Sequence, residues 1–245
     1  MELLVLGSGS AFNARRQPSG YCASFDGRLA VFDLGFGNLR QLVRAGHDAA
    51  DVADVFITHR HPDHVGDLAA LLFLFRYDVK PKSGRLRLWG PRGFREFVGR
   101  LQAAHAPWCD SRGYELELVE LGDRQTVERD GWRLEALAVP HPTPALAYRF
   151  VYKGTSLVYS GDTGFCPELA DFAADSDLFL LECATSEKEA FEGHLTPRLA
   201  LATLEASRCR RGLLTHLSAS ALEELRALRK PRGVALARDL QRVIL

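Results

Sequence analysis

The sequence predicts a single α/β domain that spans residues 1–245. Short β-type runs alternate with amphipathic helical stretches almost throughout, which is the pattern of α/β proteins. The composition, 47% hydrophobic and 25% charged, is ordinary for a globular protein, and the length suffices for one large buried core. We find no convincing repeat, low-complexity tract or linker that would divide the chain.

The expected strands are short apolar or alternating runs bounded by turn residues. Asp26-Gly27, Asp130-Gly131 and Lys153-Gly154 each favour a tight turn, so we expect hairpins there. Gly7-Ser-Gly-Ser10 follows the first strand but lacks the spacing of phosphate-binding loops, and we interpret it as a tight turn. The expected strands cover residues 2–6, 21–25, 29–32, 53–58, 85–89, 115–121, 134–139, 145–152, 155–160, 178–181 and 213–214.

The expected helices begin and end at residues that favour helix boundaries. The first stops near Gly46, the second has Pro62 in its first turn, and the third follows Gly90-Pro91. Two later amphipathic helices complete the set. These helices cover residues 38–44, 65–75, 93–104, 197–206 and 219–228.

The loop between the strand 53–58 and the next helix carries an unusual density of metal-binding side chains. Within Thr58-His-Arg-His-Pro-Asp-His64 lie three imidazoles and one carboxylate: His59, His61, His64 and Asp63. A site for two divalent cations needs several neutral nitrogen donors together with carboxylate oxygens. A polar turn with solvent-facing histidines would explain one or two of these residues, whereas the whole set predicts a metal site.

Three later residues also follow expected strands directly, where site residues of α/β proteins usually lie. His141 stands between Pro140 and Pro142, and Asp162 lies in Ser160-Gly-Asp-Thr-Gly164. His216 follows Leu213-Leu-Thr215. Taken singly, each histidine would suit a structural role, but the shared position predicts that they join the metal site.

Charge and cysteine content exclude several other classes of protein. Lys and Arg number 31 and Asp and Glu also number 31, which gives no sign of a dedicated nucleic-acid binder. The five cysteines form no Cys-x-x-Cys pair, so we expect free thiols in a reducing compartment. The N-terminus lacks the features of a signal peptide and no apolar run suits a membrane span, which predicts a cytoplasmic protein.

The motifs together resemble the metallo-β-lactamase superfamily, which carries His-x-His-x-Asp-His, a later lone His, an Asp and a final His. The chain is most similar to the ribonuclease Z branch and its phosphodiesterase relatives. Further matching pieces span nearly the whole chain: Leu6-Gly-Ser-Gly-Ser-Ala11, Phe32-Asp-Leu-Gly35, Gly90-Pro-Arg-Gly93, Ser160-Gly-Asp-Thr163, Gly193-His-Leu-Thr196 and Leu214-Thr-His-Leu217. The resemblance implies a single-domain αββα sandwich with its site at one edge of two sheets.

The resemblance also implies how the ligands divide. His59, His61 and His141 would hold one metal, and Asp63, His64 and His216 the other, with Asp162 bridging. Zinc suits this nitrogen-rich set, and manganese or iron could also occupy it. The implied reaction is attack on a phosphodiester by a hydroxide held between the two cations.

Three residues have implied catalytic roles in this reaction. Asp63 would orient the attacking hydroxide and accept its proton while binding the second metal. His194 lies in the Gly-His-x-Thr position and is the candidate acid that protonates the leaving group. Glu182 would orient His194, although the surrounding Leu181-Glu-Cys-Ala-Thr185 matches the family motif imperfectly.

The expected substrate is a small or cyclic phosphodiester rather than RNA. Ribonuclease Z enzymes typically carry a long arm that grips tRNA, often between the lone His and the bridging Asp. Here His141 and Asp162 are only 21 positions apart, and an expected hairpin fills the interval. A tRNA 3′-end endonuclease without the arm, a thioester, lactone or β-lactam hydrolase, and a metal-binding or redox scaffold stay as alternatives. A homodimer is also possible, because Leu71–Phe75 would suit either an interface or the core.

Overall fold

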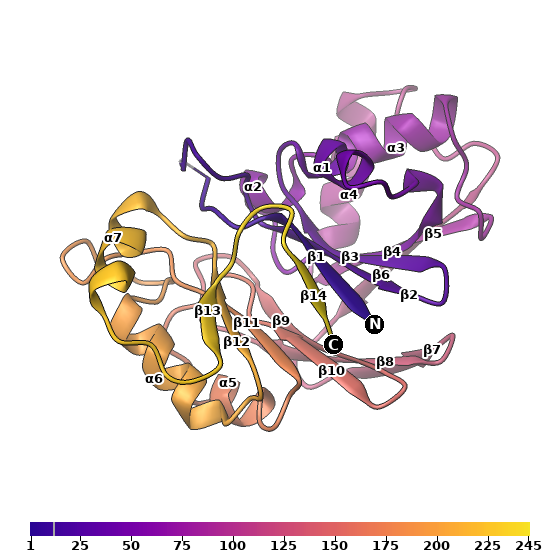
Figure 1. Ribbon diagram of the computed structural model, residues 1–245. Coiled ribbons are helices and arrows are strands. Elements are labelled where there is room, and N and C mark those ends of the chain that lie inside the picture. Colours follow the sequence, from indigo (N-terminus) through magenta and orange to yellow (C-terminus); the bar gives the residue numbers. More distant parts are fainter. Residues whose placement is uncertain (12) are drawn as a thin grey trace.

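The computed structural model describes residues 1–11 and 13–245, and it shows two β-sheets packed face to face with helices on both outer faces (Figure 1). Each sheet has seven strands. The first has the order β14-β1-β2-β3-β4-β5-β6, and the second has the order β13-β12-β11-β10-β9-β8-β7. This arrangement is the predicted αββα sandwich.

The strands of the first sheet are β1 (Glu2–Gly7), β2 (Gly20–Phe25), β3 (Arg28–Leu34), β4 (Val52–Phe56), β5 (Arg85–Pro91), β6 (Glu115–Leu121) and β14 (Arg242–Ile244). Those of the second are β7 (Thr126–Arg129), β8 (Trp132–Ala138), β9 (Leu146–Tyr152), β10 (Thr155–Tyr159), β11 (Leu178–Glu182), β12 (Gly212–Thr215) and β13 (Val234–Leu236). All three predicted hairpins form, and they join β2 to β3, β7 to β8 and β9 to β10.

The helices cover the two outer faces of the sandwich. On the first sheet lie α1 (Asn38–Arg44), α3 (Leu68–Tyr77) and α4 (Phe94–Ala104), and on the second lie α5 (Pro167–Phe172), α6 (Pro197–Ser207) and α7 (Ala219–Ala227). The seven residues Thr58–His64 are called the heptad below, and the short helix α2 (Pro62–Val65) carries part of it. A single 3-10 turn spans Ala49–Asp51. No helix in the described ranges is long and apolar enough to cross a membrane.

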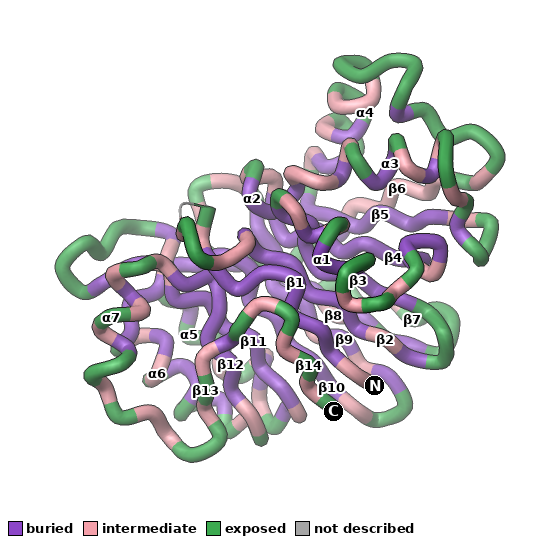
Figure 2. Tube along the Cα trace, turned by 45° about the horizontal axis from the view of Figure 1, so that its top comes forward, coloured by how far each residue is buried: buried purple, intermediate pink, exposed green. Residues whose placement is uncertain are grey.

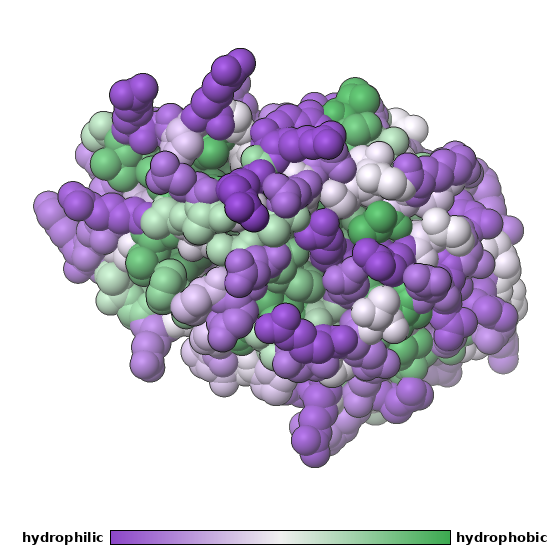
Figure 3. Space-filling model, turned by 90° about the horizontal axis from the view of Figure 1, so that it is seen from below, coloured by the Kyte–Doolittle hydropathy of each residue, from purple (hydrophilic) through white to green (hydrophobic). Residues whose placement is uncertain are grey.

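Three hydrophobic clusters correspond to the three interfaces between these four layers. The central cluster between the sheets is rich in aromatic side chains, among them Phe56, Trp89 and Phe150. A second cluster joins the first sheet to α3 and α4, and a third joins the second sheet to α5, α6 and α7. Figure 2 shows the consequence, because the strands are buried along most of their length while exposed residues gather at loops and outer helix faces. The face seen in Figure 3 is largely hydrophilic, with hydrophobic side chains confined to limited areas.

The structure corrects the prediction of one helix over 65–75. Val65 is the last residue of α2, and α3 begins only at Leu68. Asp67 causes the break, because its backbone N–H donates to Leu34 O of β3 and its carboxylate accepts from Leu39 N. The chain is therefore tied to the first sheet just after the heptad, which fixes the direction in which the heptad leaves β4.

The apolar run that would suit either an interface or the core belongs mostly to the core. Leu71, Leu72 and Phe75 are buried, whereas Phe73 is half exposed. The helix Pro167–Phe172 and the edge strands β13 and β14 were not predicted, since each is only three to six residues long. Gly7 and Gly9 are explained by close packing of neighbouring chain segments rather than by phosphate binding. A Cβ on Gly7 would lie 1.8 Å from Pro18 O.

Candidate metal centre

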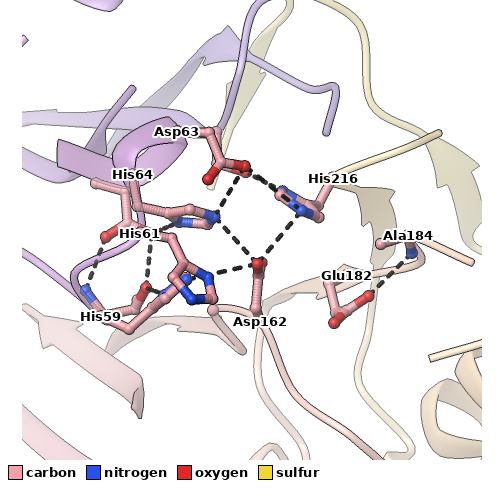
Figure 4. Close-up of polar contacts among 12 residues, drawn as sticks. His59, His61, Asp63, His64, Asp162, Glu182, Ala184 and His216 are labelled. Carbon is pink, nitrogen blue, oxygen red and sulfur yellow. Dashed lines mark hydrogen bonds and ion pairs between the residues drawn. The ribbon is translucent and has the colours of Figure 1, made fainter. Parts of the chain in front are cut away.

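Both sheets contribute metal-binding side chains to one edge of the sandwich. His59 and His61 leave the carboxyl end of β4, and Asp63 and His64 lie in the first turns of α2. Pro62 at the first helical position sets the direction of that turn. Asp63 and His64 therefore point back toward the loop, and Figure 4 shows the four side chains converging.

The second sheet supplies the remaining three candidate ligands, each from a strand exit. His141 follows β8, Asp162 follows β10, and His216 follows β12 directly. The three segments come together because their strands lie in one sheet with carboxyl ends at the same edge as β4. Every residue predicted as a ligand therefore lies in one cluster, and Asp162 and His216 are almost completely buried.

Asp162 lies at the centre of this cluster. Its Oδ2 atom is 3.2 Å from His64 Nε2, 3.3 Å from His216 Nε2 and 3.6 Å from His59 Nε2. Asp63 Oδ2 lies near two of the same nitrogen atoms, 3.7 Å from His64 Nε2 and 3.9 Å from His216 Nε2. Three groups of candidate ligands result. The first is His59, His61, His141 and Asp162, and the second is Asp63, His64 and His216. The third, Asp162, His194 and His216, shares a residue with each of the others and brings His194 to the edge of the cluster.

The hydrogen-bond inventory of the cluster tests whether these residues fit metal ions. Three buried atoms of its residues have no hydrogen-bond partner among the described residues: His59 Nε2, His64 Nε2 and Asp162 Oδ1. Unsatisfied polar atoms of this kind are rare in protein interiors unless they serve a ligand or ion. The Nδ1 atoms of His59 and His64 are engaged by Thr58 and Asp33, as in metal-ligating imidazoles. The donor set therefore fits a pair of divalent cations.

Three of the candidate imidazole ligands are oriented by a hydrogen bond at their Nδ1 atom. His64 Nδ1 lies 2.7 Å from Asp33 Oδ2, and His216 Nδ1 lies 2.8 Å from Ser19 Oγ. His141 Nδ1 lies 3.0 Å from Gly193 O. All three contacts fix the ring angle. The Asp33 carboxylate and the Gly193 carbonyl accept, so they also favour the tautomer of His64 and His141 that leaves Nε2 free to bind.

Asp33 is the organising residue that sequence reasoning missed. Its buried carboxylate accepts hydrogen bonds from Thr58 N, Thr58 Oγ1 and Tyr159 OH and pairs with His64. It thereby joins β3, the start of the heptad and β10. The signal was present in Phe32-Asp-Leu-Gly35, where a charged residue interrupts an apolar strand, but the pattern alone does not reveal what it contacts.

Burial and neighbouring charges set the protonation of the cluster. Burial holds the pKa of His59, His61 and His141 below its ordinary value, which favours the neutral form that binds metals. For His64, the charges of Asp162 and Asp33 outweigh burial and raise its pKa. Burial opposes ionisation of Asp162, but the surrounding histidines lower its pKa well below the ordinary range.

Glu182 and His194 form a second pair beside the cluster. Glu182 is fully buried at the end of β11, and its carboxylate accepts from the backbone N–H groups of Thr163 and Ala184. Its Oε1 lies 2.8 Å from His194 Nδ1. Burial opposes protonation of His194, yet the hydrogen bond and charge of Glu182 prevail and raise its pKa to about 9. Glu182 thus contacts His194, as its expected orienting role requires.

A cavity of about 750 Å³ opens next to this pair. His141 and His194 form part of its wall, together with the loop that carries Gly193. His194 also approaches the cluster itself, with its ring stacked at 5.7 Å from that of His216. A ligand in the cavity would therefore contact both the metal-binding edge and the His194 ring.

The fold and the cluster together define a class of protein: an αββα sandwich with a buried His/Asp cluster, consistent with a dinuclear metal site, at the edge of its sheets. Comparison with known proteins gives the family. The model of the beta-lactamase superfamily domain matches residues 28–217, and the chain belongs to the metallo-β-lactamase superfamily.

Individual relatives agree with this placement. Ribonuclease Z of Methanosarcina acetivorans is 24% identical over 98% of this chain and 96% of its own. The metallo-β-lactamase fold protein YhfI from Bacillus subtilis superposes with a TM-score of 0.83, at 20% identity over 99% of this chain and 98% of that one. A diphosphatase of the PhnP family gives a TM-score of 0.79, at 20% identity over 100% and 97%.

Proposed function

We propose that this protein is a dinuclear metal-dependent phosphodiesterase that acts on small or cyclic phosphodiesters. The observation that carries the proposal is the convergence of seven His and Asp side chains beside the Glu182–His194 pair. Hydrolysis of a phosphodiester needs an activated water, stabilisation of phosphoryl charge and a proton for the leaving group. This edge of the sandwich offers residues for all three requirements.

In this proposal His59, His61 and His141 hold one cation and Asp63, His64 and His216 hold the other, with Asp162 between them. Two of the three groups of candidate ligands support this division. When bound, two cations would supply an activated water near neutral pH and stabilise the charge that develops on a phosphoryl oxygen. Zinc is the proposed metal, because imidazole nitrogen dominates the donor set, and manganese or iron would also suit it.

The chain's own residues supply the proton transfers. Asp63 Oδ2 faces His64 and His216 and is placed to orient the attacking water and accept its proton. His194 donates a proton to the leaving oxygen from the nitrogen that Glu182 does not engage. Glu182 is a positioning residue, because its carboxylate holds the His194 ring and three backbone N–H groups hold the carboxylate.

A small substrate is supported by what lies between His141 and Asp162. Strands β9 and β10 fill that interval as a plain hairpin within the second sheet, and no arm projects from it. The alignment with the Methanosarcina ribonuclease Z extends over 303 positions against a chain of 245 residues, so that relative contains segments that this chain lacks.

A tRNA 3′-end endonuclease without an arm is the second candidate, favoured by the ribonuclease Z relatives. One assay separates the two functions. The zinc- or manganese-loaded protein is offered a precursor tRNA with a 3′ trailer, and in parallel bis(p-nitrophenyl) phosphate and cyclic nucleotides. Turnover of the small phosphodiesters with intact precursor tRNA is the expected result. Clean cleavage after the discriminator base would contradict it and establish tRNA maturation.

The metal assignment has its own test. His141→Ala removes a ligand from the exposed side of the cluster, so we expect loss of most activity on every substrate and a lower metal content. His105→Ala is the matched control, because His105 is exposed on the C-terminal end of α4. Full activity of His141→Ala would contradict the two-metal assignment. The remaining alternative is a thioester or lactone hydrolase. It would be supported if the wild-type protein hydrolysed such a substrate and left phosphodiesters intact.

A further inference from the structure

Two phenyl rings stand exposed at the cavity beside the candidate metal centre. Phe165 is 56% exposed and Phe191 is 60% exposed, and both line the same cavity as His141 and His194. Phe165 follows the loop of Asp162, and Phe191 precedes His194 by three residues. Exposed rings of this size are costly in water, and a pair beside a reactive site indicates a surface that a ligand covers.

The backbone holds the two aromatic segments next to each other. Gly164 N donates to Pro140 O at 2.7 Å, and a Cβ on Gly164 would lie 3.4 Å from Gly193 N. The loops on which Phe165 and Phe191 stand are therefore in contact through their glycines. The Phe191 ring meets His194 edge to face at 5.0 Å, so it lies directly beside the candidate proton donor.

The other residues of the cavity indicate what kind of group enters it. Among its described lining residues none is Lys or Arg, and Pro140, Pro142 and Leu199 give it apolar walls. Its carboxylate, Glu192, would repel a second phosphate. The cavity therefore suits a neutral planar group attached to the phosphodiester and does not suit a polyphosphate or the next phosphate of an RNA chain.

We propose that Phe165 and Phe191 bind the nucleobase of a nucleoside phosphodiester by stacking, so that the substrate class is a cyclic or otherwise small nucleotide. The inference rests on the proposed phosphodiesterase function and adds the specificity-determining residues. Stacking on phenyl rings would stabilise binding of any nucleobase, because every base has a flat face. The phosphodiester would then lie at the metal-binding edge, with its leaving oxygen near His194.

A comparison of two substrates tests the proposal. Cyclic AMP carries a base, whereas glycerol cyclic phosphate has none. We expect Phe165→Ala and Phe191→Ala each to lower the ratio of kcat/KM for cyclic AMP to that for glycerol cyclic phosphate about tenfold, mainly through KM. Phe→Trp substitutions, which keep a stacking surface, should preserve the ratio. Phe73→Ala, at a half-exposed phenyl on α3, is the control.

A binding measurement separates this inference from the proposed function. In Phe191→Trp, adenosine monophosphate should quench the added indole fluorescence, measured as the difference from wild type, whereas ribose 5-phosphate should not. Quenching without turnover of any phosphodiester would support the base site and overturn the phosphodiesterase function. Turnover of cyclic AMP with an unchanged substrate ratio in both alanine variants would overturn the base site and leave the phosphodiesterase function standing.

Discussion

Asp33 and His216 have positive backbone φ angles of 54° and 52°, although neither is glycine. Each such residue costs about 1–3 kcal/mol, and positions of this kind cluster at functional sites. Asp33 also coincides with a shift of register between β2 and β3. The bulge turns its carboxylate toward Thr58 and His64, so local strain in β3 is the physical means by which the metal loop is oriented.

Asp33→Asn tests this role of a residue that touches no metal in the proposed arrangement. An amide has only one oxygen, so it cannot accept from Thr58, Tyr159 and His64 at once. We therefore expect metal affinity to fall about 10- to 100-fold. Competition with a zinc chelator measures the affinity. Asp54→Asn is the control, because Asp54 is another buried carboxylate, bound to Arg87 and Trp89. Equal losses of affinity in both variants would count against the orienting role.

His194→Ala distinguishes proton donation from simple packing. We expect kcat to fall about 10²- to 10³-fold for a phosphodiester with an alkoxide leaving group, which needs a proton. The loss for bis(p-nitrophenyl) phosphate should be much smaller, since p-nitrophenolate leaves without protonation. Glu182→Gln should also lower kcat more for the alkoxide substrate than for bis(p-nitrophenyl) phosphate, but by a smaller factor. Equal losses on both substrates would remove the general-acid role.

At the scale of elements, the loop after β10 must pass very close to the start of the heptad. Gly161 has a φ of 59°, and a Cβ there would lie 2.7 Å from Thr58 Cβ. Thr58 precedes His59 and is bound to Asp33. The glycine therefore allows the Asp162 loop of one sheet to pack on the His59 loop of the other, which joins the two halves of the metal site.

Gly161→Ala should be more destabilising than positive φ alone explains. We expect the free energy of unfolding to fall by about 3 kcal/mol, combining left-handed backbone strain with overpacking against Thr58. Gly27→Ala is the matched control, because Gly27 has a φ of 73° with nothing within 4 Å, and it should lose only about 1 kcal/mol. Urea denaturation of the metal-free proteins measures both. Similar losses of unfolding free energy in Gly161→Ala and Gly27→Ala would show that the close approach of Gly161 to Thr58 is unimportant.

Asp177 joins the start of three parallel strands in the second sheet. Its carboxylate accepts from Ser156 N and Ser156 Oγ, next to the start of β10, and pairs with Arg210 before β12. Burial opposes its ionisation, but the Ser156 hydrogen bonds and the nearby arginines outweigh burial and lower its pKa below the ordinary 3.8. The carboxylate thus stabilises the fold only when ionised.

The sign of the pH effect follows from that lowered pKa. The folded state binds the proton more weakly than the unfolded state, so the stabilisation is complete above pH 3.8 and disappears as pH falls through the folded-state pKa. We expect Asp177→Asn to cost about 1 kcal/mol at pH 7 and almost nothing at about pH 2. Urea denaturation at both pH values measures the difference, with Asp171→Asn on α5 as the exposed control. A cost independent of pH would contradict the assignment.

At the scale of the whole molecule, the candidate metal centre lies at one edge of two sheets whose shared core is largely apolar. His59, His61, Asp63 and His64 come from the first sheet, and His141, Asp162 and His216 from the second. A bound ion would therefore link both halves at one edge, and its binding energy would add to the stability of the folded state.

Metal removal should consequently lower the thermal stability of the entire domain. With free zinc at a thousandfold excess over its Kd, the stabilisation is about 4 kcal/mol, which corresponds to roughly 10 °C in Tm. Calorimetry with and without a chelator measures the shift. His216→Ala should show a smaller shift, whereas His105→Ala should behave like the wild-type protein. A chelator-independent Tm would contradict binding across the two sheets.

The sequence by itself determined the class of site and most of the elements. The heptad and three strand-exit residues give the candidate ligands because metal chemistry restricts both residue type and position, and the hairpins follow from local turn preferences. Only the tertiary structure decided the contacts of Asp33, the break at Asp67 and the position of Phe165 and Phe191 on one cavity. These depend on contacts between residues far apart in the chain, which local periodicity and spacing do not predict.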